Sequence, residues 1–296
     1  MTESRFELRS VTKKFGKATA LEDVSLSVTG KSIIGLVGKN GSGKTTLLRQ
    51  ITGLYLPTSG RCETFGVPTD KLGPGELSRI GAVQQDDIFP EWMKIRQLLG
   101  YVSHFYTQWD KELEQHLLDT LELDENQRVG TLSPGNKQKL SLIIATCHHP
   151  ALLLLDEPLS DLDPIARQDV LESLLDQFRS DDVTIVISSH MLPELERIAD
   201  RVVFLDRGRI IVDEDLDVLK EGYAEWVVSS KAGALPGEFG EEFVISAEGD
   251  RHRARLVVSD SPGLAEQFAN RYSAEVEVRP LNLERIFALR GRRAGQ

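Results

Sequence analysis

The sequence predicts an α/β protein whose core is a mainly parallel sheet, and two observations lead to this fold class. Short, nearly continuous apolar runs recur along the chain, and apolar residues between them return at helical spacing. Such runs are typical of strands that are buried on both faces, as in a parallel sheet wound with helices. The predicted strands are Ser32–Val37, Ile80–Gln84, Ala151–Leu155, Val183–Ile187 and Arg201–Leu205, and the predicted helices are Lys44–Thr52, Leu162–Phe178 and Pro193–Ile198.

Three further regions differ from this core. Phe6–Ser10 and Leu21–Thr29 alternate apolar and polar residues, which predicts an antiparallel β subdomain. From about residue 87 to 149, apolar residues recur at helical spacing and predict a helical insertion. A first domain at residues 1–218 is then followed by a small α+β domain at 219–296. Its expected strands are Tyr223–Ser229, Glu242–Ser246, Arg251–Ser259 and Ala274–Val278, and its expected helices are Pro262–Tyr272 and Leu283–Leu289.

Composition and charge favour some classes of partner over others. The chain has 296 residues and a formal net charge of −11, which argues against a nucleic-acid partner because phosphates would repel it. Cys62 and Cys147 show neither a disulfide framework nor metal-ligand spacing, and this indicates a reduced, cytoplasmic compartment. Apolar runs fall short of the roughly 18–20 residues that a membrane span needs, so a membrane partner would be a different chain.

A phosphate-binding loop is predicted where the first core strand ends. The segment GKNGSGKT, from Gly38 to Thr45, fits the pattern G-x-x-x-x-G-K-[ST] between a strand and a helix. Glycines let backbone N–H groups turn toward phosphates, and the helix that starts at Lys44 adds its positive end. The Lys44 side chain is expected on the β- and γ-phosphates, and the Thr45 hydroxyl on Mg²⁺. The core is therefore expected to be of the P-loop NTPase type.

Two carboxylates end another predicted strand. Asp156 and Glu157 follow the run LLLL, at the sheet edge where ligands of open α/β sheets bind. Phosphoryl transfer needs a metal, a charge clamp and an oriented nucleophile. Asp156 suits the metal, and Glu157 suits the attacking water. A solvated strand end would produce the same pattern, and the phosphate loop upstream favours the catalytic interpretation.

From about Arg5 to Asp217 the chain resembles the ATP-binding cassette (ABC) ATPases, because further motifs follow in that family's order. Gln85 matches the Q-loop glutamine, Leu132–Asn136 (LSPGN) the signature motif, Asp163 the D-loop, His190 the switch histidine and Phe15 the aromatic residue that stacks on adenine. Gln84 is the alternative to Gln85, and Phe15 could equally cap the core of the β subdomain.

The resemblance implies a role for each matching residue. Glu157, His190 and Gln85 would be catalytic, and Thr45, Gln85 and Asp156 would hold Mg²⁺. ATP would be bound by Phe15, Gly38, Lys39, Asn40, Gly41, Ser42, Gly43, Lys44, Thr45 and Thr46. The signature residues Ser133, Gly135 and Asn136 would receive the γ-phosphate of ATP held by a second cassette.

The signature motif also has a physical interpretation. Ser133 is a good helix N-cap, and Gly135 would permit close backbone approach to an anion. The motif departs from the usual LSGGQ, since Pro134 replaces a glycine and Asn136 a glutamine. Pro134 has no N–H to donate, which puts one backbone contact in doubt. The neighbouring pair His148-His149 is expected to be two solvated helix-end histidines rather than a metal site.

The resemblance implies an ATP-hydrolysing motor of a membrane exporter, with ATP and Mg²⁺ as cofactors. Its partners would be a second cassette and a separate polytopic permease at the inner face of the membrane, where Phe89, Pro90, Trp92 and Met93 are candidates to line the docking groove. The segment Leu281–Phe287 resembles the C-terminal extension of bacterial exporter cassettes, and dimerisation, regulation and simple stabilisation remain open for that domain. The alternatives are a soluble ABC ATPase acting on ribosomes or DNA, and another P-loop enzyme such as a small-molecule kinase.

Overall fold

A computed structural model describes residues 3–85, 87–180, 182–231, 233–259 and 263–293. The chain divides into two compact units, residues 1–213 and residues 214–296. The boundary expected after residue 218 would cut helix α8 (Leu216–Glu221), which the structure places wholly in the second unit. Among the described residues, none of the helices combines the length and the apolar character needed to cross a bilayer.

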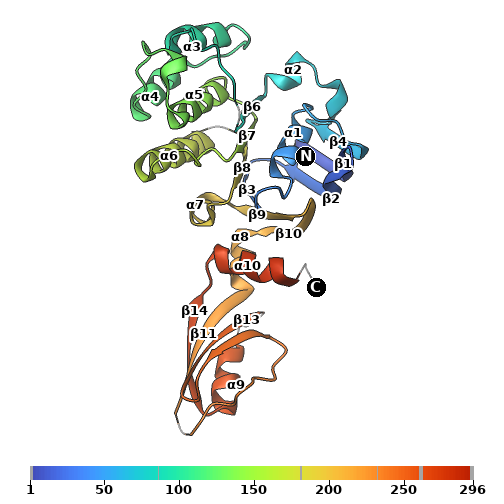
Figure 1. Cartoon of the computed structure of the whole chain (residues 1–296), viewed down its shortest axis with the longest axis vertical. Helices are drawn as coiled ribbons and strands as arrows, with labels where there is room; N and C mark the ends of the chain where they lie inside the picture. Colours follow the sequence, from blue (N-terminus) through green and yellow to red (C-terminus); the bar gives the residue numbers. More distant parts are fainter. Residues whose placement is uncertain (1–2, 86, 181, 232, 260–262, 294–296) are drawn as a thin grey trace. The chain divides into compact units, whose positions relative to one another are not determined.

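The larger sheet of the first unit has the strand order β10-β9-β3-β8-β7-β6 (Figure 1). Strands β3, β6, β7, β8 and β9 pair in parallel through β3–β8, β3–β9, β6–β7 and β7–β8. Their bounds are Ile33–Val37 (β3), Ile80–Val83 (β6), Leu152–Asp156 (β7), Thr184–Ser189 (β8), Arg201–Asp206 (β9) and Arg209–Asp215 (β10). Because Asp156 pairs with Ser188 and Val37 with Ser189, the ends of β3, β7 and β8 meet at one edge of the sheet.

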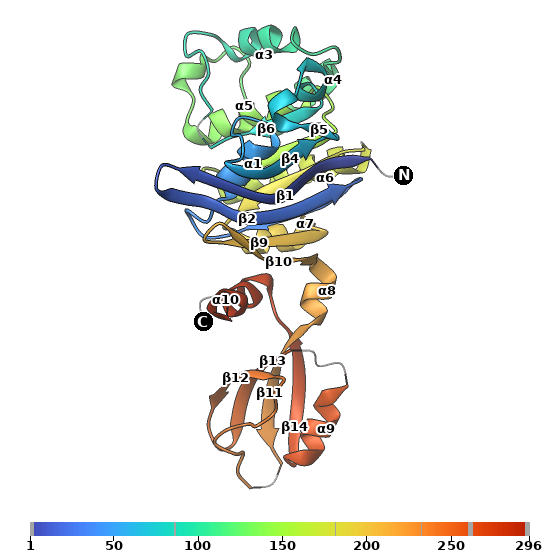
Figure 2. The same cartoon turned by 90° about the vertical axis from the view of Figure 1, so that its right-hand side faces the viewer.

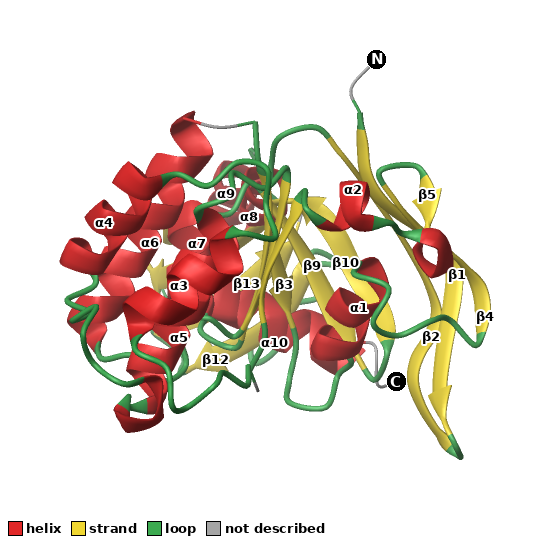
Figure 3. Ribbon diagram, turned by 90° about the horizontal axis from the view of Figure 1, so that it is seen from above, coloured by secondary structure: helices red, strands yellow, loops and turns green. Residues whose placement is uncertain are grey.

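Helices cover both sides of this sheet. Figure 3 shows α4 to α7 on one side of the core strands and α1, with strands β1 and β2, on the other. Both β3 and β7 are buried along their whole length, as their continuous apolar runs predict. The helices are Lys44–Ile51 (α1), Pro74–Leu77 (α2), Ile95–Ser103 (α3), Lys111–Thr120 (α4), Pro134–Thr146 (α5), Pro164–Ser180 (α6) and Leu192–Ile198 (α7), with short 3₁₀ turns at Thr69–Lys71 and Val129–Thr131. The predicted helical insertion corresponds to α3, α4 and α5.

A second sheet of the first unit has the order β2-β1-β4-β5 and antiparallel pairing. Its strands are Ser4–Phe15 (β1), Ala18–Thr29 (β2), Ser59–Thr64 (β4) and Val67–Pro68 (β5). Strand β1 continues past the predicted end at Ser10, which has a positive φ of 48° where the pairing shifts register. This bulge breaks the alternation of side chains without ending the strand, so the pattern stops five residues before Phe15.

The second unit folds as an antiparallel sheet in the order β12-β13-β11-β14, with helix α9 on one face (Figure 2). Trp226, on the central strand, is fully buried and its ring lies 5.3 Å from Phe268 of α9. The elements are Leu216–Glu221 (α8), Tyr223–Ser230 (β11), Val244–Gly249 (β12), Arg253–Ser259 (β13), Leu264–Arg271 (α9), Ala274–Pro280 (β14) and Leu283–Arg293 (α10). Part of the predicted helix Pro262–Tyr272, residue 262, lies outside the described residues.

Candidate active site

The glycine loop between β3 and α1 is shaped by close backbone contacts. Gly43 has a φ of 110°, and a Cβ there would lie 2.6 Å from the Ala20 carbonyl oxygen. A Cβ on Gly38 would lie 2.5 Å from the carbonyl oxygen of Leu205. Both positions therefore need glycine, one for its conformation as well as its size. Beyond the loop, α1 starts with the bond from Leu47 N–H to the Gly43 carbonyl.

Lys44 lies at the base of the loop and is buried. Its ammonium donates a hydrogen bond of 2.8 Å to the Gly38 carbonyl and forms an ion pair of 3.2 Å with Glu157 Oε1. Because a buried ammonium needs compensating negative charge, this position suits a lysine that binds a phosphate or, equally, a carboxylate. The loop lysine and the strand-end carboxylate thus meet at the edge of the sheet.

The two acidic residues at the end of β7 have different surroundings. Asp156 Oδ1 accepts a hydrogen bond of 2.6 Å from Ser188 Oγ, on the neighbouring strand β8. Its other oxygen, Oδ2, is buried and has no hydrogen-bond partner among the described residues. A buried carboxylate oxygen that lacks a donor suits a cation, because it would otherwise remain desolvated and uncompensated.

Glu157 is held in a left-handed backbone conformation with a φ of 51°. Its N–H points at Ser188, at 3.1 Å from the carbonyl oxygen and 3.0 Å from Oγ. Its Oε2 lies 2.7 Å from His190 Nδ1, and Oε1 faces Lys44. The carboxylate therefore sits between two cationic or potentially cationic groups, His190 on one side and Lys44 on the other.

These groups surround a cavity of about 460 Å³. The residues that line it are Phe15, Ala20, Asn40, Gly41, Ser42, Gly43, Lys44, Thr45, Thr46, Gln85, Asp156, Glu157, Ser160 and His190. Most of the residues predicted to bind ATP or to act in catalysis are thus brought together. Ala20 and Ser160 also line it. Ser160 opens the segment Ser160–Asp163 that resembles the D-loop, although only Asp163 of that segment was predicted as a site residue. Ala20 was not predicted, because its place depends on the packing of β2 against the glycine loop rather than on a local motif.

The two glutamines after β6 separate clearly. Gln85 lines the cavity, whereas Gln84 accepts a hydrogen bond of 3.1 Å from Arg49 Nε. Phe15 also lines the cavity, is 44% exposed, and packs edge-on against Tyr55 with ring centres 5.2 Å apart. A partly exposed ring at the cavity wall can stack on a base. Gly38 and Lys39 lie in the loop but are not among the described lining residues, and Gly38 contributes its carbonyl to Lys44.

The predicted signature motif lies at the start of α5 and not in this cavity. Ser133 is the N-cap, with its Oγ 3.2 Å from the N–H of Asn136. Pro134 occupies the first helical position, where an N–H has no partner within the helix. The approach of an anion to Gly135 stays a prediction, and a second reason for glycine is visible here: a Cβ would lie 2.6 Å from the Asp161 carbonyl oxygen. Its small size is required by packing within this chain.

Asp163 has a local structural role. Its Oδ1 accepts the N–H groups of Ile165 at 3.0 Å and Ala166 at 3.1 Å, so the side chain caps α6. The Ala166 N–H is the main cause that holds the pKa of Asp163 below its usual value. Asp163 is not among the described residues that line the cavity, and Ser160 is the member of this turn that reaches it.

The prediction of two solvated histidines is wrong for His148. This ring is buried, stacks on Tyr106 with centres 4.1 Å apart, and places its two nitrogens 3.3 Å from the carbonyls of Ile144 and Ile80. Burial lowers the pKa of His148. His149 Nε2 instead lies 3.0 Å from Asp110 Oδ2.

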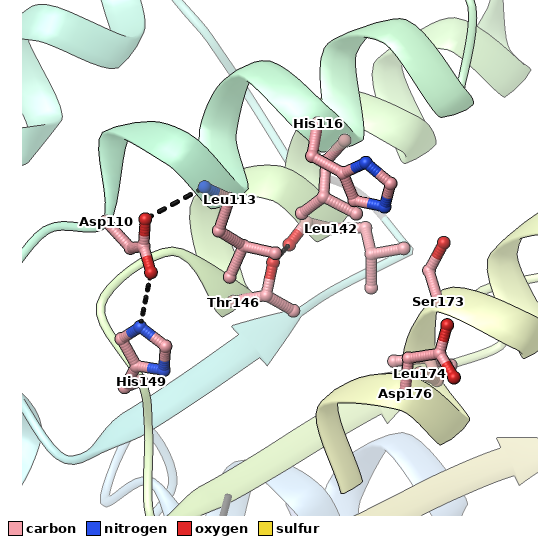
Figure 4. Close-up of a pocket in the computed structure, with 10 residues that line it drawn as sticks. Asp110, Leu113, His116, Leu142, Thr146, His149, Ser173, Leu174 and Asp176 are labelled. Atoms are coloured by element: carbon pink, nitrogen blue, oxygen red, sulfur yellow. Dashed lines mark hydrogen bonds and ion pairs between the residues drawn. The ribbon is translucent and has the colours of Figure 1, made fainter. Parts of the chain in front are cut away.

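Asp110 and His149 border a second cavity of about 400 Å³ between α4, α5 and α6 (Figure 4). The residues of the described chain that line it include Asp110 and Asp176 but no lysine or arginine. Two carboxylates without a permanent cation would repel a triphosphate. The cavity beside Lys44 is therefore the better candidate for the nucleotide site.

Comparison with known proteins agrees with this geometry. The family model described as ABC transporter matches residues 21–160. The chain is 35% identical over 217 residues to the ABC transporter ATP-binding protein YtrB of Bacillus subtilis (strain 168), covering 73% of this chain and 74% of YtrB. It is 32% identical over 298 residues to the Nod factor export ATP-binding protein I of Burkholderia lata, covering 97% of each chain.

A solved structure shares the fold of most of the chain. It is a dimeric ATP-binding cassette in a post-hydrolysis state, bound to ADP and Pi, with a TM-score of 0.63 and 25% identity. The match covers 71% of this chain and 98% of the solved chain. The glycine loop, the buried Asp156-Glu157 pair and these relatives lead to one conclusion: the chain belongs to the ABC transporter family, as an ATP-binding subunit that couples ATP hydrolysis to transport.

Proposed function

We infer that this subunit powers an exporter by closing on a second cassette around ATP and by hydrolysing ATP with Glu157 as the base. The observation that carries this proposal is the position of the Glu157 carboxylate, in the cavity wall between Lys44 and His190. A carboxylate there can polarise a water aimed at a phosphate held by the glycine loop. Phosphate oxygens that enter the loop would compete with Glu157 for the Lys44 ammonium and release the carboxylate for the water.

The residues present fit a magnesium ion. Asp156 Oδ2 is buried without a donor among the described residues, and the Thr45 hydroxyl and Gln85 line the same cavity. Hydroxyl, amide and carboxylate oxygens, together with phosphate oxygens, are ligands that Mg²⁺ accepts. Bound there, Mg²⁺ would neutralise charge on the β- and γ-phosphates. Ser188, through its bond to Oδ1, would keep the Asp156 carboxylate turned toward the ion.

The signature turn supports a dimeric mechanism. Ser133 and Pro134 are exposed, and neither is among the described residues that line this chain's own cavity. A helix N-terminus that faces outward can receive a phosphate held by another copy. The solved relative described as a dimer, bound to ADP and Pi, supports the same arrangement here.

The proposals of export and of a permease partner are based on the names of relatives and on an exposed apolar segment. One matching protein is named for Nod factor export and another for bacitracin transport, and these names favour export. Close after Gln85, Ile88 is 94% exposed and Trp92 is 72% exposed. Large apolar residues exposed beside a nucleotide site suit a partner surface, and a permease would hold the subunit at the inner face of the membrane. A soluble ABC ATPase acting on ribosomes or DNA is the alternative.

Two measurements test the proposal. Affinity purification of the tagged full chain from its own cells should recover a polytopic membrane protein, and recovery of ribosomes or DNA instead would favour the alternative. Sedimentation of Glu157→Gln with ATP should show a dimer that the further change Ser133→Arg abolishes, while monomer affinity for ATP stays the same. A dimer that persists in the double variant would contradict the role of the Ser133 turn.

A further inference from the structure

The backbone of Glu157 is fixed from both sides. A φ of 51° places it in the left-handed region, which is costly for a residue with a side chain and persists only where neighbouring contacts hold it. Its N–H is held by Ser188 at about 3 Å, from strand β8. Its carbonyl oxygen accepts a hydrogen bond of 2.7 Å from Gln138 Nε2 and one of 3.0 Å from Ser160 Oγ.

Gln138 reaches this carbonyl from a different element. It lies on α5, one turn beyond the Ser133 N-cap, and is half-buried. Its Nε2 makes the shorter of the two side-chain bonds to the Glu157 carbonyl, while its Oε1 accepts the N–H of Asp161 at 3.4 Å. One amide group therefore spans the turn that follows Glu157.

The packing of α5 makes this link stiff. Gly135 approaches the Asp161 carbonyl so closely that a Cβ would lie 2.6 Å from it. The same turn is thus contacted at Asp161 by Gly135 and by Gln138, and at Glu157 by Gln138. Stiff packing of this kind transmits a displacement of the helix start instead of absorbing it.

We propose that Gln138, on helix α5 behind the signature motif, is a positioning residue for hydrolysis. Its hydrogen bond to the Glu157 carbonyl sets the orientation of the Glu157 carboxylate. The two peptide planes that flank a Cα atom fix the direction of its Cα–Cβ bond. Ser188 holds the plane before Glu157. Gln138, with the shortest bond to the carbonyl, holds the plane after it together with the hydroxyl and N–H of Ser160. With its backbone held in one conformation, Glu157 keeps its carboxylate between Lys44 and His190. The proposal rests on the proposed function of Glu157 as the base.

The first test is Gln138→Met, which keeps length and helix propensity but removes the amide. Without this hydrogen bond the Glu157 carboxylate should be misplaced relative to the attacking water. This should lower kcat for ATP hydrolysis about 10- to 100-fold, since small misplacements at a reacting centre have effects of this size. The KM for ATP should stay within about twofold, because Gln138 is not among the described residues that line the cavity. The matched control is Gln115→Met on α4, whose amide donates to the exposed Asp119 side chain. Unchanged kcat in Gln138→Met would overturn the proposal.

The second test separates positioning from general destabilisation. In Gln138→Glu a deprotonated carboxylate has no hydrogen to donate to the Glu157 carbonyl, whereas the protonated acid does. Activity relative to the unmodified chain should therefore rise as pH falls from about 8 to about 5. Gln115→Glu should show a flat ratio over the same range. A flat ratio for Gln138→Glu, at reduced activity, would show a structural role only and would overturn the inference.

A combined variant distinguishes failure of this inference from failure of the proposed function. If Gln138 acts through Glu157, adding Gln138→Met to Glu157→Gln should not lower the residual hydrolysis further. Full turnover by Glu157→Gln alone would show that Glu157 is not the base. The proposed function and the positioning role of Gln138 would then both fail. Lost turnover in Glu157→Gln with a further, additive loss in the double variant would overturn only the role of Gln138.

Discussion

Lys44 Nζ lies 3.2 Å from Glu157 Oε1, so the cation expected to hold phosphate also neutralises the carboxylate expected to activate water. Both side chains are buried, and each would be strongly unfavourable there without the other. The pair explains how a lysine and a glutamate are tolerated at one edge of an apolar sheet. It also means that charge at this site is shared, and variants of either residue will affect the other.

Glu157→Gln should retain ATP binding and slow hydrolysis by about 10²–10⁴, the usual scale for losing a positioned base. The amide keeps the size of the side chain, but it cannot accept a proton from water. Single-turnover hydrolysis and nucleotide titration, measured on the same preparation, separate the two effects. Retained turnover would contradict the role of Glu157 as base.

The glycine loop allows a comparison between two alanine variants. Gly41 has a φ of 78° with open space around its Cβ direction, so Gly41→Ala should cost about 1–2 kcal/mol from conformation alone. Gly43→Ala adds overlap with the Ala20 carbonyl and should cost about 2–4 kcal/mol in total. Chemical denaturation of both variants provides the comparison. Equal losses would mean that the overlap at Gly43 relaxes without cost.

Ser188→Ala should raise the Mg²⁺ concentration needed for half-maximal hydrolysis and lower stability by about 1–3 kcal/mol. Its hydroxyl donates to Asp156 Oδ1, and removal would leave that buried oxygen unpaired. The control is Ser189→Ala, whose hydroxyl accepts instead from the N–H of Met191 at 2.8 Å. A magnesium titration that gives the same midpoint for both variants would argue against Asp156 as a ligand.

Alkaline pH should destabilise the chain through its two thiols. Burial raises the pKa of Cys62 and of Cys147 from 9.0 to about 12. The unfolded chain therefore loses these protons first, so the stability from the buried thiols is present below pH 9 and is lost as pH rises toward 12. Between pH 8 and about 10.5, the midpoint temperature of thermal unfolding should fall less steeply with pH for the double variant Cys62→Ala/Cys147→Ala than for the unmodified chain. Parallel slopes for the two proteins would contradict this prediction.

The sequence predicts the α/β core and the main site residues because those features are local. A buried apolar run, a glycine loop and a strand-end carboxylate each occupy a few consecutive residues. Ser188 was missed as a functional residue because the predicted strand ended at Ile187, where the apolar run stops. The ladder continues through the pairing of Asp156 with Ser188, which only the sheet register reveals.

The remaining misses have related causes. Gln138 is an ordinary polar residue on a helix, and its bond to the Glu157 carbonyl spans 19 positions in sequence. His148 looks like a helix-end residue, yet the ring of Tyr106 covers it. Asp163 matches a motif, while its Oδ1 accepts the N–H groups that cap α6. For Gln138 and His148, tertiary packing decides what the side chain contacts, whereas the Asp163 cap is a local contact that a motif match does not reveal.

The half-exposed ring of Phe15 has a consequence for nucleotide preference. Within the described lining, the hairpin of β1 and β2 contributes Phe15 and Ala20, and neither side chain carries a hydrogen-bonding group. An aromatic face attracts any flat heterocycle according to its area and not to the groups along its edge. Guanine nucleotides should therefore serve as fuel nearly as well as adenine nucleotides, and the smaller pyrimidines less well.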